Sequence, residues 1–310
     1  MYVKKNWKVR LVGILPKQLQ AAAWATRAYR RKFGCWPNLL RPQSFNEMVQ
    51  ARKAWSRDPR LPILADKHRV KDYVLEKLGA DWIIPTLWAG ETLPLPDARD
   101  WPKPFVIKAN NGCNRNIFVR SDIDCDWAGI ESRCAAWLTS IYGADHGEWL
   151  YSQIVPMIIV EPFISSDNEL PLDYKFWTFH GRVEFIHVVT GREHDEKQAF
   201  FDRHWTRVAG NQGFTLETRD LPPPSSLEAM IDAAERLAAD IDFVRVDLYE
   251  IDGRPLFGEM TFYPGSGLNP INPPEFDRQL VDLWKGRGAS ALVRAPMAGR
   301  TPSPSADAPY

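Results

Sequence analysis

The sequence lacks the patterns of a membrane span, a disulfide framework and a zinc site. None of its apolar runs approaches the roughly 20 residues that a membrane-spanning helix needs, and the run at 11–15 is too short for the core of a signal peptide. Its four cysteines show neither CxxC nor zinc-ligand spacing, which indicates free thiols in a reducing compartment. We therefore expect a cytoplasmic protein without a membrane span.

A charge bias and two familiar catalytic patterns are also missing. Thirty-nine lysines and arginines balance 39 aspartates and glutamates, so no bulk charge indicates nucleic-acid binding. The six histidines lack metal-ligand spacing, and no Ser–His–Asp arrangement is legible, which argues against a hydrolase. The 45% apolar and 25% charged residues are ordinary for a soluble globular chain, and 310 residues suffice for two packed lobes.

One predicted hairpin carries a dense group of charged residues. Residues 243–251, FVRVDLYEI, alternate apolar and polar side chains as a half-buried strand does, and the Asp-Gly pair that follows predicts a tight turn into a second strand. Pairing of these strands places Arg245, Asp247 and Glu259 side by side. Buried carboxylates and guanidinium groups need partners, and magnesium and phosphate are suitable ones. An ion-paired surface hairpin is the alternative, but the Gly-rich turn at 263–267 favours a metal–phosphate site.

Other segments carry charges at strand ends. Lys108 ends a predicted strand before an Asn/Gly-rich loop whose amides could cradle phosphates, although a surface lysine is the alternative. Glu161 ends a buried strand. Asp173 and Lys175 share one face of a second predicted hairpin, where they form either part of a site or a simple ion pair.

The chain ends differ in character from its centre. Residues 18–33 predict a helix with several cations at its C-terminal end, which favours a solvated basic helix end over a weak membrane contact. Residues 286–310 are rich in Pro, Ser and Ala, and this composition predicts disorder.

The order of these segments resembles the ATP-grasp fold, and more closely the TupA-like ATP-grasp family, which is named for teichuronopeptide biosynthesis and occurs in bacterial polysaccharide gene clusters. The resemblance covers about residues 40–285 and is carried by six segments: SFNEM, ADKHRVKDYVLEKLGADWIIP, FVIKANNG, IIVEPFI, DYKFWTFHG and FVRVDLYEIDGRPLFGEMTFYPGSG. It implies an α+β fold in which two lobes with antiparallel sheets sandwich the nucleotide. The implied divisions are a helical segment at 1–45, an N-terminal lobe with the phosphate loop at 46–160, a C-terminal lobe with the metal site at 161–285 and a disordered tail at 286–310.

The resemblance also implies roles for individual residues. Arg245 and Lys108 are the implied catalytic residues, and Asp247 and Glu259 the implied Mg²⁺ ligands. The implied nucleotide-binding residues are Lys67, Lys108, Gly112, Asn114, Glu161, Phe163, Asp173 and Lys175: the two lysines and the glycine–asparagine turn for the phosphates, Glu161 and Phe163 for the adenine, Asp173 for the ribose and Lys175 again for the phosphates.

Three positions depart from the usual ATP-grasp pattern or leave alternatives. Arg115 either contacts phosphate or points into solvent. Thr261 stands where typical ATP-grasp ligases have a metal-binding Asn, which leaves a second metal open, and Asn269 is either a substitute for it or an exposed loop residue.

The function implied by the resemblance is an ATP-dependent carboxylate–amine ligase that works through an acyl phosphate in cell-surface polysaccharide or peptide-polymer biosynthesis. ATP and Mg²⁺ are the expected cofactors. Carboxylate and amine substrates, among them a glycan or peptide precursor, are the expected partners, and no nucleic acid is expected. The alternatives are a kinase or a glycosyltransferase-type enzyme of the same pathways, or a non-catalytic nucleotide-binding scaffold.

Overall fold

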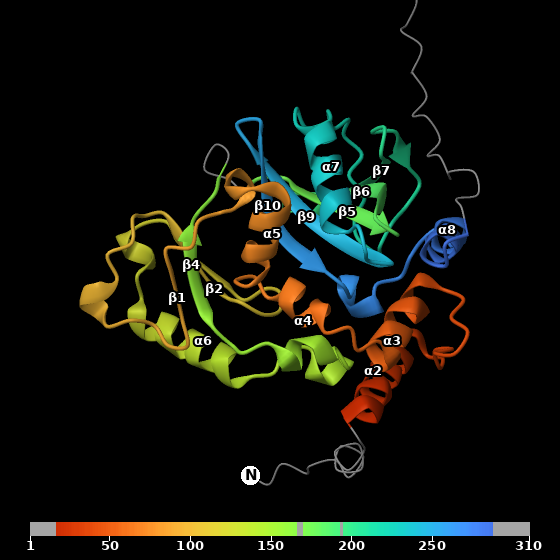
Figure 1. Ribbon diagram of the computed structural model, residues 1–310, viewed down its shortest axis with the longest axis horizontal. Helices are drawn as coiled ribbons and strands as arrows, with labels where there is room; N and C mark the ends of the chain where they lie inside the picture. The colour runs from red at the N-terminus through yellow and green to blue at the C-terminus, as the bar shows by residue number, and fades with distance from the viewer. Residues whose placement is uncertain (1–16, 166–169, 193–194, 288–310) are drawn as a thin grey trace, which may run out of the picture.

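The computed structural model describes residues 17–165, 170–192 and 195–287, and it contains two antiparallel sheets with helices around them (Figure 1). The smaller sheet has the strand order β1-β4-β2-β3 and the larger one β10-β9-β5-β6-β7-β8. The strands are β1 (Trp88–Gly90), β2 (Phe105–Ala109), β3 (Asn116–Val119), β4 (Ile158–Pro162), β5 (Asp173–Phe179), β6 (Arg182–Thr190), β7 (Lys197–Asp202), β8 (Arg207–Val208), β9 (Phe243–Ile251) and β10 (Arg254–Thr261).

The smaller sheet has one apolar face and one face with charged residues. Phe105 and Ile107 of β2 form a core with Ile158 and Val160 of β4, and helix α6 (Trp127–Thr139) covers this core. Because side chains alternate along a strand, Lys108 and Glu161 point to the opposite face. The sequence thus folds into a sheet that presents a lysine and a carboxylate away from its core.

The larger sheet is built around two hairpins. Asp173 pairs with Val189 across the β5–β6 hairpin, and β9 lies between β5 and β10. A bulge at Gly258 interrupts the β9–β10 register, so that Glu259 lies opposite Asp247. A Cβ atom at this glycine would lie 2.9 Å from the backbone oxygen of Asp247, which explains why the bulge takes a residue without a side chain.

Six further α-helices in the described part of the chain surround the larger sheet and the N-terminal segment. They are α2 (Lys17–Phe33), α3 (Phe45–Trp55), α4 (Arg60–Ala65), α5 (Val70–Leu78), α7 (Leu227–Leu237) and α8 (Pro274–Trp284), with the short turn of helix at Pro264–Gly267 after β10. Phe45 of α3 packs against Trp177 and Phe243 of the larger sheet. Helices α3, α4 and α5 therefore belong to the core of the larger sheet, although they precede the smaller one in the chain.

The expected α+β class and both hairpin turns are confirmed. The predicted division of the chain at residue 160 stays a prediction, and residues 288–310 of the predicted tail lie outside the described residues. No helix in the described part of the chain combines the length and apolar character that a membrane crossing requires.

Candidate functional site

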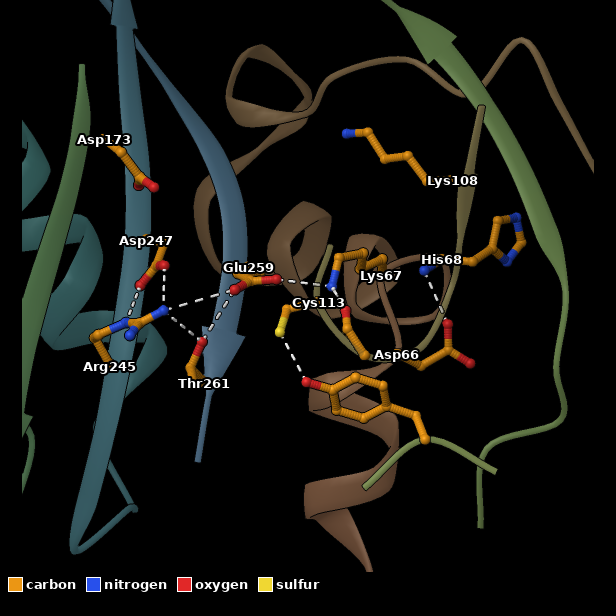
Figure 2. A network of polar contacts seen from close by, with 12 residues as sticks. Asp66, Lys67, His68, Lys108, Cys113, Asp173, Arg245, Asp247, Glu259 and Thr261 are labelled. Atoms are coloured by element: carbon orange, nitrogen blue, oxygen red, sulfur yellow. Dashed lines mark hydrogen bonds and ion pairs between the residues drawn. The ribbon is translucent and has the colours of Figure 1, made fainter. Parts of the chain in front are cut away.

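A cleft of about 340 Å³ lies where the charged faces of the two sheets meet. Lys108 and Glu161 line it from the smaller sheet, and Asp173, Lys175 and Asp247 line it from the larger one. Figure 2 shows the side chains of β9 and β10 directed towards Lys67 and the loop that carries Cys113. The cleft therefore gathers charged residues that are far apart in the sequence.

Asp247 is the most enclosed carboxylate of the cleft. Its side chain is 2% exposed. Arg245 donates two hydrogen bonds of 2.7 Å to its two oxygens, and Lys175 Nζ donates a third of 2.7 Å to Oδ2. Lys175 also donates to Asp173 Oδ2 at 2.5 Å. Burial raises the pKa of Asp247, although Arg245 and Lys175 oppose this effect.

Glu259 extends this network towards the other side of the cleft. Its Oε2 lies 2.7 Å from Lys67 Nζ and its Oε1 lies 3.7 Å from Arg245. Burial alone would raise the pKa of Glu259, but Lys67, Arg245 and Lys175 outweigh burial and hold the pKa at about 2. Lys67 Nζ also donates to the Gly112 carbonyl at 2.7 Å, so this lysine links the 112–116 loop to β10.

Glu161 forms a second charge cluster at the same cleft. It is buried, and its two oxygens lie 2.5 Å from Lys71 Nζ and 2.6 Å from Lys108 Nζ. Burial would raise its pKa, but Lys108 and Lys71 lower it on balance. The carboxylate therefore holds two ammonium groups in fixed positions, and its oxygens are already used by them.

The turn after β10 is held by helix α3. Ser266 has a left-handed φ of 57°, and Lys53 Nζ donates to both its carbonyl and its hydroxyl at 2.7 Å. Gln50 Nε2 donates to the carbonyls of Ser266 and Gly267 at 3.0 and 2.9 Å. Gly265 of this turn lines the cleft, so α3 fixes one wall of the site.

Most residues predicted for the site do lie together. Those that line the cleft are Lys67, Lys108, Asn114, Glu161, Asp173, Lys175, Arg245, Asp247 and Glu259. Gly112 contacts Lys67 beside it. Phe163 is not among the lining residues: its ring packs edge-on against Phe118, and its backbone N–H donates to Pro104. The roles predicted for these residues stay predictions.

Arg115 does not simply point into solvent, and its phosphate contact stays a prediction. Its guanidinium donates to Asn111 Oδ1 at 3.0 Å, to the Trp137 carbonyl at 3.2 Å and to Ser140 Oγ at 2.9 Å. It therefore ties the 110–116 loop to the end of α6. Thr261 accepts from Arg245 and donates to Glu259, and Asn269 lines the cleft.

Lys71 and Lys53 are the residues that sequence reasoning missed. Lys71 lies in the first turn of α5, whereas Lys67 precedes this helix, so their four-residue spacing gave no direct signal that the two lysines share the cleft. Lys53 had no signal either, because its partners at 146 and 266 are distant in the sequence.

The donors for a metal ion are limited. No group of three or more His, Cys, Asp or Glu side chains that could hold a metal occurs among the described residues. Asp247 and Glu259 supply two carboxylates in register, which suits Mg²⁺ only if substrate phosphates and water complete its oxygen ligands.

Comparison with known proteins shows what the chain is similar to. The family model described as TupA-like ATPgrasp matches residues 47–285, whereas no curated protein matches the chain. Among solved structures, D-alanine–D-alanine ligase from Bacillus anthracis complexed with ATP is 15% identical, with a TM-score of 0.40, over 64% of this chain and 55% of that chain. L-amino acid ligase from Bacillus licheniformis is 14% identical, with a TM-score of 0.48, over 87% of this chain and 62% of that chain. In both cases this chain spans less than two thirds of the other protein.

Proposed function

Because the chain belongs to the TupA-like ATP-grasp family, we propose that it is an ATP-dependent carboxylate–amine ligase of cell-surface polysaccharide or peptide-polymer biosynthesis, acting in the cytoplasm. One observation carries the proposal: Lys67, Lys175 and Arg245 surround the facing carboxylates Asp247 and Glu259 in one cleft. A site for uncharged substrates has no use for so many charges, since each is costly to bury without a partner.

The charges suit the transfer of a phosphoryl group to a carboxylate. A carboxylate oxygen attacks the terminal phosphorus of ATP, the bond to the bridging oxygen breaks, and ADP leaves. Lys108 and Lys67 are placed to offset the negative charge of the nucleotide phosphates, and Arg245 is placed to stabilise the charge on the transferred group. An amine then attacks the acyl carbon, phosphate leaves with the electron pair of the broken C–O bond, and the amine loses a proton to give the amide.

Asp247 and Glu259 would hold Mg²⁺ together with phosphate oxygens, and the ion would supply positive charge between the phosphates. Their fit to a metal rests on their adjacent register on β9 and β10 and on the low pKa of Glu259, about 2, which keeps this carboxylate ionised. Arg245, Lys175 and Lys67 hold both carboxylates in place.

Asp173 supports the predicted ribose contact. Its Oδ2 accepts from Lys175, whereas its buried Oδ1 has no hydrogen-bond partner among the described residues. A buried carboxylate oxygen without a partner is costly, and a sugar hydroxyl would satisfy it. The family resemblance implied that Glu161 contacts the adenine base. We propose instead that Glu161 positions Lys108 and Lys71.

The proposal is tested by following nucleotide turnover in Asp247→Asn and Glu259→Gln. The matched control is Asp252→Asn, in the exposed turn of the same hairpin, where the left-handed φ of 51° also suits Asn. With ATP, Mg²⁺ and a panel of amino acids and uronic acids, we expect the wild type and the control to release ADP and phosphate. We expect the two site variants to lose at least about a hundredfold in rate while they keep the wild-type circular dichroism spectrum.

Oxygen labelling identifies the reaction. With carboxylates labelled in ¹⁸O, an acyl phosphate delivers one labelled oxygen to the released phosphate, and mass spectrometry detects it. A phosphorylated acceptor without released phosphate would mean that the enzyme is a kinase. ADP release that is unchanged in both site variants would exclude the proposed site.

A further inference from the structure

The positive charge of the chain is concentrated at its N-terminal end. Residues 1–46 contain ten of the 39 lysines and arginines and none of the 39 acidic residues. Residues 47–310 consequently hold 29 basic and 39 acidic side chains, although the whole chain is neutral. This separation of basic from acidic residues along the chain indicates a surface that binds a polyanion or an anionic interface.

Helix α2 displays much of this charge to solvent. Ala21, Ala25 and Ala28 of this helix are buried, and α2 packs against α3. Arg27, Arg30, Arg31 and Lys32 are all exposed. Within the described residues none of these four cations forms an ion pair with a carboxylate, so their charge is available to a partner.

Two exposed apolar side chains follow these cations in the chain, and one of them, Trp36, contacts Arg30. Trp36 is 61% exposed and Leu40 is 84% exposed. The Arg30 guanidinium lies 4.1 Å from the centre of the Trp36 ring. Trp55, which is 51% exposed, donates from its indole to the Leu39 carbonyl at 3.0 Å and so joins this region. We call Arg27, Arg30, Arg31, Lys32, Trp36 and Leu40 the basic N-terminal surface.

We propose that the basic N-terminal surface docks the protein on an anionic phospholipid bilayer. Cations attract the anionic headgroups, and each basic residue close to the membrane surface raises the binding affinity about fivefold. Tryptophan prefers the boundary between headgroups and acyl chains, and the exposed Leu40 gains by leaving water there. The proposed contact is peripheral, because α2 lies on the surface of the fold (Figure 1) and is not long and apolar enough to cross a membrane.

A soluble polyanion is favoured less by the same residues. A flexible acidic polymer uses the cations but leaves Trp36 and Leu40 in water, whereas a bilayer uses both kinds of side chain. The surface shares no residue with the cleft, whose lining begins at Lys67. Docking is therefore separate from the proposed ligase activity, and each can fail without the other.

The test measures co-sedimentation of the full chain with phosphatidylcholine vesicles that contain or lack phosphatidylglycerol. We expect binding only with phosphatidylglycerol, and release by high salt. Arg30→Glu together with Arg31→Glu should lower the partition coefficient by about tenfold or more. The control reverses two exposed cations on the larger sheet, Arg182→Glu with Arg254→Glu, and should stay within about twofold of the wild type.

A second variant separates the bilayer from a soluble polymer. Trp36→Ala should weaken vesicle binding and leave binding to soluble poly-glutamate nearly unchanged. Three results would each overturn the proposal: equal binding to both kinds of vesicle, an Arg30→Glu/Arg31→Glu variant that binds like the wild type, or binding to poly-glutamate without binding to vesicles. Unchanged thermal unfolding of the variants verifies that they are folded.

Discussion

Replacement of Lys53 by methionine tests how helix α3 supports the cleft. The Lys53 side chain is completely buried. Its ammonium group donates to Ser266 twice at 2.7 Å and to the His146 carbonyl at 3.1 Å, whereas its nearest carboxylate, Glu148, is 3.9 Å away. Burial lowers the pKa of Lys53 to about 8, and Glu148 opposes this effect only in part.

The lowered pKa makes stability depend on pH in a definite direction. In the unfolded chain the lysine titrates at its ordinary value of 10.5. Between pH 8 and 10.5 the unfolded state therefore binds more protons than the folded state, and the free energy of unfolding rises with pH. Below pH 8 both states are protonated, and the folded state bears the full cost of the buried charge. Integration between pH ~7 and ~9.5 gives a rise of about 2 kcal/mol.

Urea unfolding of the wild type and of Lys53→Met across this pH range measures the effect. Methionine has a similar length and does not titrate, so the difference in unfolding free energy between the two proteins should grow by about 2 kcal/mol in favour of the wild type towards high pH. Val49→Ala is the matched control, because it removes buried packing of the same helix against the same turn without a polar or titrating group, and its difference from the wild type should be independent of pH. If the difference in unfolding free energy between Lys53→Met and the wild type does not change with pH, burial does not lower the pKa of Lys53.

Two further substitutions test the packing that places the site. Phe45→Ala removes a fully buried ring at 5.0 Å from that of Trp177 and 5.2 Å from that of Phe243, and urea unfolding should show a loss of about 3–5 kcal/mol; a loss below about 1 kcal/mol would contradict the packing. Gly258→Ala brings a methyl group to 2.9 Å from Asp247 O and should cost about 1–3 kcal/mol. It should also reduce the rise in melting temperature with ATP and Mg²⁺, and an unaltered rise would mean that the bulge does not set the position of Glu259.

The sequence predicted the parts of the site that depend on local pattern. Alternation along 243–251 and the Asp252–Gly253 turn predict which side chains share a face, so the proximity of Arg245 and Asp247 follows from residues close in the chain. The place of Glu259 opposite Asp247 follows less directly, since it depends on the bulge at Gly258. A glycine in a strand indicates a bulge without fixing the register that results.

The parts that escaped prediction depend on packing between distant segments. Arg115 follows an Asn/Gly loop and carries a charge, which is compatible with a phosphate contact, but its partners on α6 become visible only once the helix is placed. The predicted adenine role of Phe163 stays a prediction, and the contact of its ring with Phe118 also depends on packing that the sequence does not show. Lys53 sits in a helix of ordinary composition, and its burial depends on residues about 90 and 210 positions away.

The charge pairs of the cleft indicate what must change when a nucleotide binds. Glu161, Asp173, Asp247 and Glu259 each already accept a cation. Phosphates that draw these cations away from the carboxylates would leave the carboxylates without a partner, and a second cation such as Mg²⁺ would then restore their charge balance. Lys67 is placed for such an exchange, because it contacts both Glu259 on β10 and the Gly112 carbonyl in the loop across the cleft. Binding of nucleotide and of metal should therefore be coupled, each strengthening the other, with Lys67 as the side chain that changes partners between the two sides of the site.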